Sequence, residues 1–188
     1  IAIGCEARGT VIDLNLRRLK ELDDQFSSSL NTIYSTVDAI EKHVMNSDLV
    51  IGAVLVPGAA APRLVTEDMI KGMRRGAVIV DVAIDQGGCI ETAKATTHDN
   101  PTYRVHDVVH YCVANMPGAV ARTSTFALNN ATLPFMLALA DKGFAQAMRD
   151  DPHLKAGLNV HGGKVTYEAV ANDLNLAYRP ADEVLAAS

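Results

Sequence analysis

Short apolar runs alternate with amphipathic stretches over the first two thirds of the chain, a pattern typical of alternating strands and helices. Residues 49–56 and 77–83 are the longest apolar runs and are rich in valine and isoleucine. Runs of this kind are typical of parallel strands that are covered on both faces. We therefore expect two buried parallel strands in these segments. Shorter apolar patterns predict further strands at residues 10–13, 32–35, 103–106 and 111–114.

Segments with helical periodicity follow the first two predicted strands. Apolar residues spaced three and four apart predict helices over residues 16–26 and 37–44. A third helix is expected over residues 67–73, because Thr66 can cap its first turn and the two acidic residues that follow suit the positive end of a helix. The alternation as a whole predicts an α/β doubly wound sheet with right-handed crossovers.

The pattern changes after Pro117, where a long alanine-rich helix is expected. Glycines and prolines interrupt the remainder, and one more short helix is expected near Val170. We place a boundary near Ala121. It separates an α/β domain over residues 1–121 from a helical segment over residues 122–188.

Composition and charge restrict the class of protein. Of the 188 residues, 48% are hydrophobic, which can fill a sizeable core and excludes disorder. Seventeen Lys and Arg against 22 Asp and Glu give a net charge of −5, so we expect neither a nucleic-acid surface nor an anionic-membrane surface. The apolar runs are too short to cross a bilayer, and the first residues lack the pattern of a signal peptide.

The cysteines and histidines give no sign of a metal site. Cys5, Cys89 and Cys112 form a sparse, odd set without CxxC spacing, which indicates a reducing compartment. His106 and His110 would share a face only on a helix, while their segment is predicted to be strand or loop. We therefore expect a cytoplasmic protein without a bound metal, in which His106 has a structural role.

Asp13 ends an expected strand, where a dinucleotide-binding fold keeps an acid for the adenosine ribose. That acid normally lies about 20 residues after a glycine-rich phosphate loop. No GxGxxG motif occurs in the sequence, and counting back about 20 residues from Asp13 runs past residue 1. Spacing alone leaves two interpretations open: an ordinary acid at a strand end, or a fold whose first βα unit is missing from the chain.

Longer motifs decide between these interpretations. The segments Ile51-Gly-Ala-Val-Leu-Val-Pro-Gly-Ala-Ala-Ala-Pro-Arg-Leu-Val65 and Val80-Asp-Val-Ala-Ile-Asp-Gln-Gly-Gly88 closely resemble alanine dehydrogenases. Residues 105–107, 111–117, 127–132 and 157–166 extend the resemblance over essentially the whole chain. The α subunit of proton-translocating nicotinamide nucleotide transhydrogenase shares the Pro-Gly-x-x-Ala-Pro turn. It usually differs where this chain has Ala-Ile-Asp-Gln-Gly-Gly, so the resemblance favours alanine dehydrogenase.

The resemblance implies a Rossmann-type doubly wound parallel sheet without its first βα unit, followed by C-terminal helices that pack on an absent substrate domain. It implies NAD-dependent oxidative deamination of L-alanine to pyruvate and ammonia, and a closed homo-oligomer, a hexamer in the family. The glycine loop, the catalytic histidine and the substrate-binding basic residues belong to the absent part, so we expect the chain alone to be inactive. Two other interpretations stay open: the nucleotide-binding part of a transhydrogenase, and a non-catalytic fragment retained for assembly.

The resemblance also assigns roles to individual residues. Asp85 would be the catalytic acid that orients or deprotonates the water attacking an imine, and its plainer alternative is an Asx-turn residue. Asp13 is favoured as the ribose acid, which selects NAD over NADP because a carboxylate repels a 2′-phosphate. Asn115 offers both a donor and an acceptor to a carboxamide or ribose. The other implied cofactor residues are Arg18, Ser35, Val54, Leu55, Val82, Ala83, Ile84, Lys94, Val113, Ala114 and Met116.

Several of these residues have plainer alternatives. Arg18 could be a solvated helix charge, Ser35 a cap of the following helix and Lys94 a surface lysine. Val54 and Leu55 could serve in core packing, and both roles can hold together.

Overall fold

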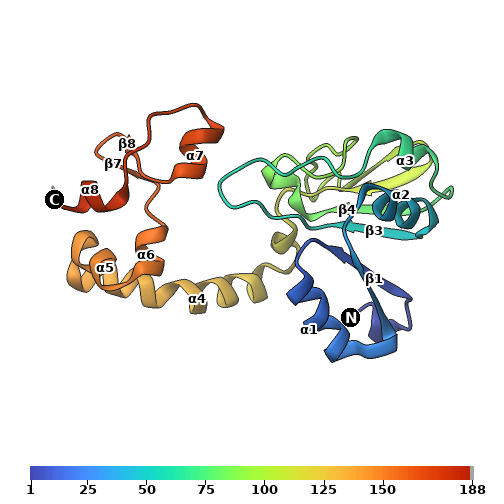
Figure 1. The fold of residues 1–188 in the computed structure, drawn as a ribbon, viewed down its shortest axis with the longest axis horizontal. Helices are drawn as coiled ribbons and strands as arrows, with labels where there is room; N and C mark the ends of the chain where they lie inside the picture. Colours follow the sequence, from blue (N-terminus) through green and yellow to red (C-terminus); the bar gives the residue numbers. More distant parts are fainter. Residues whose placement is uncertain (187–188) are drawn as a thin grey trace. The chain divides into compact units, whose positions relative to one another are not determined.

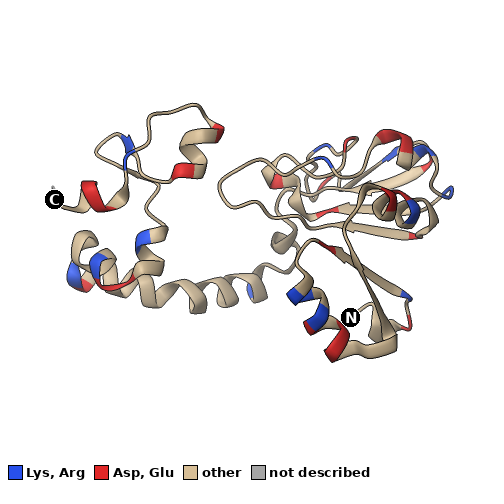
Figure 2. Ribbon diagram, in the orientation of Figure 1, with Lys and Arg blue, Asp and Glu red and all other residues tan. Residues whose placement is uncertain are grey.

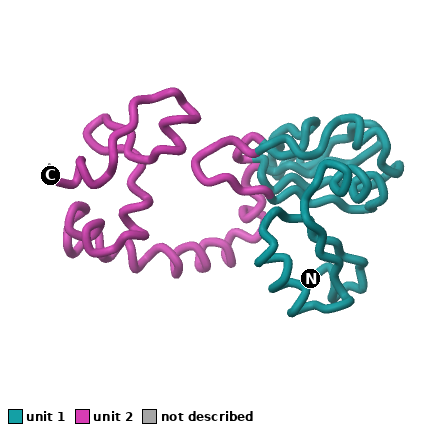
Figure 3. Tube along the Cα trace, viewed as in Figure 1, with its two compact units in different colours: residues 1–53, 62–84, 88–113 teal, residues 54–61, 85–87, 114–188 magenta. Residues whose placement is uncertain are grey.

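The computed structural model describes residues 1–186, which cluster into two compact units (Figure 3). Unit 1 comprises residues 1–53, 62–84 and 88–113. Unit 2 comprises residues 54–61, residues 85–87 and the chain from residue 114 onward. Two loops that leave the sheet of unit 1 therefore belong to unit 2.

Unit 1 begins with a strand–helix–strand element (Figure 1). Strand β1 (Gly9–Asp13) pairs in parallel with β2 (Leu30–Tyr34), and α1 (Leu16–Phe26) connects them. Short 3-10 turns, η1 (Ile3–Cys5) and η2 (Ser27–Ser29), precede the two strands. The parallel crossover that the alternating pattern predicts is present.

A mixed sheet forms the body of unit 1, with the strand order β3-β4-β6-β5. Strands β3 (Leu49–Gly52), β4 (Val78–Asp81) and β6 (Val108–Tyr111) run in parallel, and β5 (Thr102–Val105) is antiparallel to β6. Helix α2 (Val37–Asn46) precedes β3, and α3 (Glu67–Lys71) precedes β4. Within residues 1–186, β1 and β2 share no backbone ladder with this sheet.

Two predicted strands end earlier than their apolar runs. β3 stops at Gly52 instead of residue 56, and β4 stops at Asp81, after which the chain enters the 3-10 helix η3 (Val82–Gln86). The strand predicted over residues 111–114 is wrong in its position, because β6 spans Val108–Tyr111. The reason at β4 is local: the Asp81 side chain accepts the backbone N–H of Ala83 at 3.1 Å, so the chain turns there instead of extending the ladder.

The expectation that both faces of the first long strand are covered is wrong for β3 in unit 1. Leu49 and Ile51 are 51% and 57% exposed. Alternate residues of a strand point to the same face, so one apolar face of β3 is open to solvent.

Turn chemistry fixes the hairpin between β5 and β6. His106 and Asp107 both have positive φ, 51° and 62°, as a two-residue type I′ loop requires. The His106 Nε2 lies 2.6 Å from Oε1 of Glu67 at the start of α3. This contact agrees with the structural role expected for His106. The core of unit 1 includes the fully buried Ile70, Ile79, Ile90 and Val108.

Unit 2 is mainly helical from residue 114 onward (Figure 1). Its elements are η4 (Met116–Val120), α4 (Ala121–Lys142), α5 (Phe144–Asp150), α6 (Pro152–Ala156), β7 (Val160–His161), β8 (Lys164–Val165), α7 (Glu168–Asp173) and α8 (Ala181–Ala186). Met148, Leu158 and Leu185 form a small buried cluster. The long helix expected after Pro117 is therefore present as α4.

Helix α4 is apolar but exposed. Between Arg122 and Asp141 it carries no charged residue, and Figure 2 shows this uncharged stretch. Phe126, Leu128 and Met136 are 59%, 66% and 62% exposed, and α4 has no buried residue. No helix within residues 1–186 is long and apolar enough to cross a membrane.

Candidate functional site

Asp13 is the last residue of β1, and its side chain is exposed at the carboxyl end of the strand. Its Oδ1 accepts the backbone N–H of Asn15 at 2.8 Å. Asn15 in turn caps α1 by accepting the backbone N–H of Arg18 at 3.1 Å. The second oxygen, Oδ2, accepts no hydrogen bond from residues 1–186. Asp13 therefore presents an oriented carboxylate, with one oxygen open, beside the start of a helix.

The structure places Arg18 and Ser35 near the same strand ends. Arg18 is exposed and donates a hydrogen bond to Oε2 of Glu21 at 3.0 Å, as a helix-surface charge does. Ser35 follows β2, and its backbone N–H donates to the carbonyl oxygen of Asp13 at 3.0 Å. The alternative role of Ser35 as a helix cap is wrong, because Thr36 caps α2 through its own side chain.

The turn after β4 carries four of the predicted residues. Ala83 and Ile84 are buried, and Val82 and Asp85 are exposed. The Asp85 side chain makes no hydrogen bond within residues 1–186, so the bond that would define an Asx turn is absent there. Its carboxylate is open to solvent and available to a ligand.

Asp81, which the sequence patterns did not single out, organises this turn. Its side chain is fully buried. Oδ1 accepts the N–H of Ala83 at 3.1 Å, and Oδ2 accepts the N–H of Cys89 at 3.0 Å and of Ile90 at 3.3 Å. One carboxylate therefore binds both ends of the turn over residues 82–88.

The loop after β3 carries Val54, which is half-buried, and Leu55, which is 69% exposed. The alternative of core packing is therefore wrong for Leu55, which lies beyond the end of the strand. The backbone N–H of Ala61 donates to the carbonyl oxygen of Gln86 at 3.0 Å, which links this loop to the turn after β4. Within residues 1–186, the buried Oε1 of Gln86 has no hydrogen-bond partner.

The segment after β6 runs from the sheet into η4. Val113 is buried, Ala114 and Asn115 are exposed, and Met116 is half-buried. Asn115 caps η4, and its Oδ1 accepts the backbone N–H of Gly118 at 3.2 Å. The amide of Asn115 is therefore held in one orientation by its own turn.

Lys94 lies on a loop that Tyr103 supports. The backbone N–H of Lys94 donates to the Tyr103 hydroxyl at 2.7 Å, and that hydroxyl donates to the carbonyl oxygen of Thr92 at 3.0 Å. Tyr103 also stacks on His110, with ring centroids 5.0 Å apart. The Lys94 side chain itself is exposed.

Burial keeps the groups around Tyr103 uncharged at neutral pH. It raises the pKa of the Tyr103 hydroxyl and the pKa of the Cys112 thiol, which lies 3.6 Å from that hydroxyl. It lowers the pKa of His110 below 6.5. His110 is fully buried and its Nε2 lies 2.8 Å from the Thr92 hydroxyl. This cluster supports the Lys94 loop.

The predicted cofactor residues fall in both compact units (Figure 3). Those in unit 1 are Asp13, Arg18, Ser35, Val82, Ala83, Ile84, Lys94 and Val113. Those in unit 2 are Val54, Leu55, Asp85, Ala114, Asn115 and Met116. Within unit 1, Asp13 and Ser35 are joined by a backbone hydrogen bond, and within unit 2 the Ala61–Gln86 bond joins the loops that carry Leu55 and Asp85.

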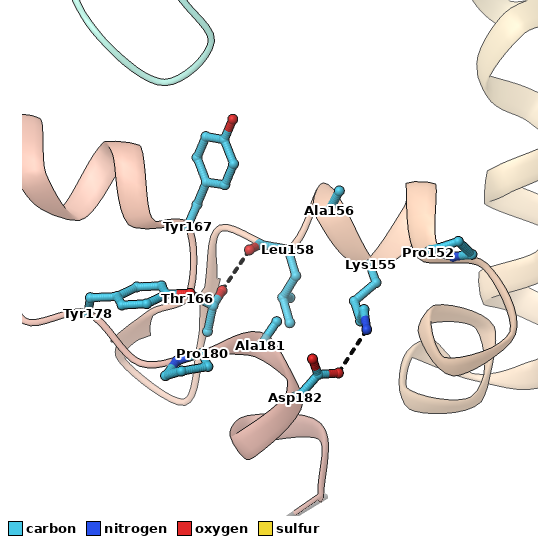
Figure 4. A pocket seen from close by; sticks show the side chains of 10 residues that line it. All are labelled: Pro152, Lys155, Ala156, Leu158, Thr166, Tyr167, Tyr178, Pro180, Ala181 and Asp182. Atoms are coloured by element: carbon cyan, nitrogen blue, oxygen red, sulfur yellow. Dashed lines mark hydrogen bonds and ion pairs between the residues drawn. The ribbon is translucent and has the colours of Figure 1, made fainter.

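A pocket in unit 2 is lined by residues other than those predicted to bind the cofactor (Figure 4). It has a volume of about 220 Å³ and is lined by helices α6 and α8 and the segments beside them. Lys155 Nζ lies 2.8 Å from Oδ1 of Asp182 in this pocket, and the Thr166 hydroxyl donates to the carbonyl oxygen of Leu158 at 2.6 Å. None of the predicted cofactor residues lines it. Residues 1–186 contain no group of three His, Cys, Asp or Glu side chains able to hold a metal ion.

Comparison with known sequences identifies close relatives. Residues 1–168 match the model of the family described as alanine dehydrogenase/PNT, C-terminal domain. The alanine dehydrogenase of Halomonas elongata is 60% identical over 185 residues, which cover 98% of this chain and 50% of that protein. Alanine dehydrogenase 2 of Staphylococcus aureus is 57% identical over 186 residues, with the same coverage. The chain spans about half the length of these relatives.

Solved structures give the same picture of the fold. An L-alanine dehydrogenase superposes with a TM-score of 0.80 at 48% identity, over 93% of this chain and 48% of that chain. A transhydrogenase from Sinorhizobium meliloti superposes with a TM-score of 0.63 at 26% identity, over 87% of this chain and 43% of that chain. The likeness confirms the predicted α/β fold class.

Proposed function

The chain belongs to the alanine dehydrogenase/PNT C-terminal domain family, and from this premise we propose that it is the NAD-binding half of an alanine dehydrogenase. The reaction would be oxidative deamination of L-alanine: alanine, NAD⁺ and water give pyruvate, ammonium, NADH and a proton. The observation that carries the proposal is 60% identity to an alanine dehydrogenase over 98% of the chain. The nicotinamide cofactor would supply the acceptor for the hydride that leaves the alanine Cα.

The residues of unit 1 fit a dinucleotide. A ribose diol donates hydrogen bonds, and Asp13 has an open carboxylate oxygen at the end of a parallel strand. The hydrogen bond from Asn15 holds its other oxygen, so the carboxylate is oriented before a ligand arrives. A 2′-phosphate in the same place would meet a like charge. Asp13 therefore supports NAD rather than NADP as the cofactor.

Asp85 would act on the substrate side of the reaction. Loss of a proton from the amino group and of hydride from the Cα of alanine leaves a protonated imine, which water must attack at carbon before ammonia can leave. The Asp85 carboxylate, exposed and without a hydrogen bond from residues 1–186, can orient that water and accept its proton. Asn115, held by its cap, would offer its amide to the carboxamide or ribose of the cofactor.

The substrate-binding part of the enzyme would lie outside this chain. We propose that residues 1–121 form the cofactor domain and that residues 122–188 pack on a substrate domain. The apolar surface of α4, with Phe126, Leu128 and Met136 exposed, supports this arrangement, because such a surface is normally covered by a partner. The relatives, twice as long, contain the extra chain that could cover it.

The same premise suggests a cellular compartment and an oligomeric state. We propose a cytoplasmic homo-oligomer, a hexamer in the assembled enzyme. Within residues 1–186 the three cysteines form no disulfide, which supports a reducing compartment. Light scattering of the assembled enzyme would measure its mass directly, and a monomer would contradict this part of the proposal.

The transhydrogenase alternative is weaker. The Sinorhizobium meliloti transhydrogenase is 26% identical, against 57–60% for the alanine dehydrogenases. An enzyme of this alternative class would transfer hydride between two nucleotides and would not need L-alanine.

The proposal can be tested with a fusion that we call the joined protein. In the joined protein, the part of the Halomonas elongata alanine dehydrogenase that this chain does not match is fused in front of residue 1. Titration with NADH should give a saturable change in NADH fluorescence, and the chain alone should bind NADH weakly. A folded joined protein that leaves NADH fluorescence unchanged would contradict the proposal and would favour a role in assembly only.

A further inference from the structure

Asp81 is an acidic side chain in the interior of unit 1, and it has no cationic partner there. It is 0% exposed, and within residues 1–186 its partners are backbone N–H groups and the Cys89 thiol. Burying a carboxylate is costly unless hydrogen bonds replace its water. An apolar residue in its place would leave the backbone N–H groups that it binds without an acceptor. There is therefore a structural reason for a carboxylate at this position.

That reason lies in what the two oxygens hold. Oδ1 accepts from Ala83 at the start of the turn after β4, and Oδ2 accepts from Cys89 and Ile90 at its end. The backbone N–H of Gly88 closes the same turn on the carbonyl oxygen of Ala83 at 2.9 Å. Asp85 lies between these anchored ends. The Asp81 side chain, four residues before Asp85, therefore holds both ends of the segment that carries it.

Two glycines make room for this arrangement. A Cβ at Gly88 would lie 2.7 Å from Oδ2 of Asp81, and Gly88 has a φ of +78°. A Cβ at Gly52, at the end of β3, would collide with the Sγ of Cys89. The carboxylate and the turn approach each other so closely that side chains larger than glycine do not fit at these points.

We propose that Asp81 is a positioning residue for Asp85: it fixes the path of the turn over residues 82–88 and so aims the Asp85 carboxylate. This inference rests on the proposed function, in which Asp85 handles the attacking water. A displacement of about 1 Å in a reacting group can lower turnover about 10²-fold. The effect of losing Asp81 should therefore appear in turnover, through Asp85.

The test is Asp81→Asn in the joined protein. Asparagine keeps the shape of the side chain but replaces one acceptor oxygen by an N–H donor, so it cannot accept hydrogen bonds at both ends of the turn. We expect kcat to fall about 10²-fold while the dissociation constant of NADH changes much less. In an Asp85→Asn background, Asp81→Asn should have little further effect on kcat. A merely structural role would lower kcat by the same factor in both backgrounds and would overturn the proposal.

Thr166→Val is the matched control. It also removes a buried hydrogen bond from a side chain to the backbone, in unit 2, and it should leave kcat unchanged even where it lowers the melting temperature. If the joined protein does not oxidise L-alanine at all, the proposed function fails, but Asp81 can still be tested by amide hydrogen exchange. Asp81→Asn should then speed exchange at Cys89 and Ile90 selectively. Unchanged or uniformly faster exchange would contradict a role in holding the turn.

Discussion

The backbone N–H of Asn15 donates a 2.8 Å hydrogen bond to Oδ1 of Asp13, and the Asn15 side chain caps the helix that follows. The acid at the end of β1 is therefore oriented by the first turn of α1, and its second oxygen stays open. This arrangement suits a group with hydrogen-bond donors, such as a ribose diol, and disfavours an anionic group.

Asp13→Ser in the joined protein should narrow the preference for NAD over NADP. Serine removes the negative charge that would face a 2′-phosphate and keeps a small polar side chain. The ratio of kcat/KM with NAD to kcat/KM with NADP measures the effect. Asp38→Ser, which removes an exposed acid from α2, serves as the control and should leave the ratio unchanged. Equal use of both cofactors by the unsubstituted joined protein would show that the role given to Asp13 is wrong.

Asp85→Asn should lower turnover far more than it weakens NADH binding. The amide keeps the shape of the side chain but cannot take a proton from water, and positioned acid–base groups contribute about 10²–10⁴-fold. Steady-state kinetics and an NADH fluorescence titration on the same preparation separate the two effects. Near-normal turnover would mean that Asp85 serves only the turn in which it lies.

Gly52→Ala should destabilise unit 1 by about 1–3 kcal/mol, because the added methyl group collides with the buried Sγ of Cys89. Denaturant unfolding measures the loss. Cys89→Ala in the same chain removes the Sγ and should recover part of that loss. Gly4→Ala is the control, since its Cβ would meet nothing within 4 Å. Equal effects of the Gly52 and Gly4 substitutions would contradict the close approach of β3 to Cys89.

The buried imidazole of His110 should make stability depend on pH below neutrality. Burial lowers its pKa in the folded state below the ordinary 6.5, so the unfolded chain takes up a proton first as the pH falls. The contribution of His110 to stability is therefore complete above pH 6.5 and decreases as the pH falls from there toward the lowered pKa. NMR titration of the histidine ring signals measures this pKa, and a value at or above 6.5 would contradict the prediction.

The sequence predicts the elements better than it predicts their ends. The alternating pattern locates the parallel strands β1 to β4, whereas β6 begins three residues before its predicted range. Thr66 caps α3 as expected, accepting the N–H of Met69 at 3.3 Å. The apolar run continues four residues beyond Gly52, yet the strand ends there. Hydrophobicity alone cannot mark such an end, because apolar residues also occupy loops such as the one that carries Leu55.

The sequence likewise indicates some residues of the candidate site and not others. Motif resemblance points to Asp13, Asp85 and Asn115 at or just beyond the ends of three strands, and the structure places them there. The sequence pattern does not single out Asp81, because it stands inside an apolar run that predicts a continuous strand. A single acid within such a run is the available signal. Asp81 binds N–H groups of residues up to nine positions further along the chain. These contacts depend on how the turn folds, so the sequence does not reveal them.

NADH formation from L-alanine and NAD tests most directly whether this chain supplies the cofactor half of an alanine dehydrogenase, as we propose. The joined protein and the chain alone are each mixed with both compounds at alkaline pH, and NADH absorbance is followed. We expect NADH to form with the joined protein, only when L-alanine is present, and not with the chain alone. Alanine-dependent NADH formation by the purified chain alone, or none by a folded joined protein that binds NADH, would contradict the account.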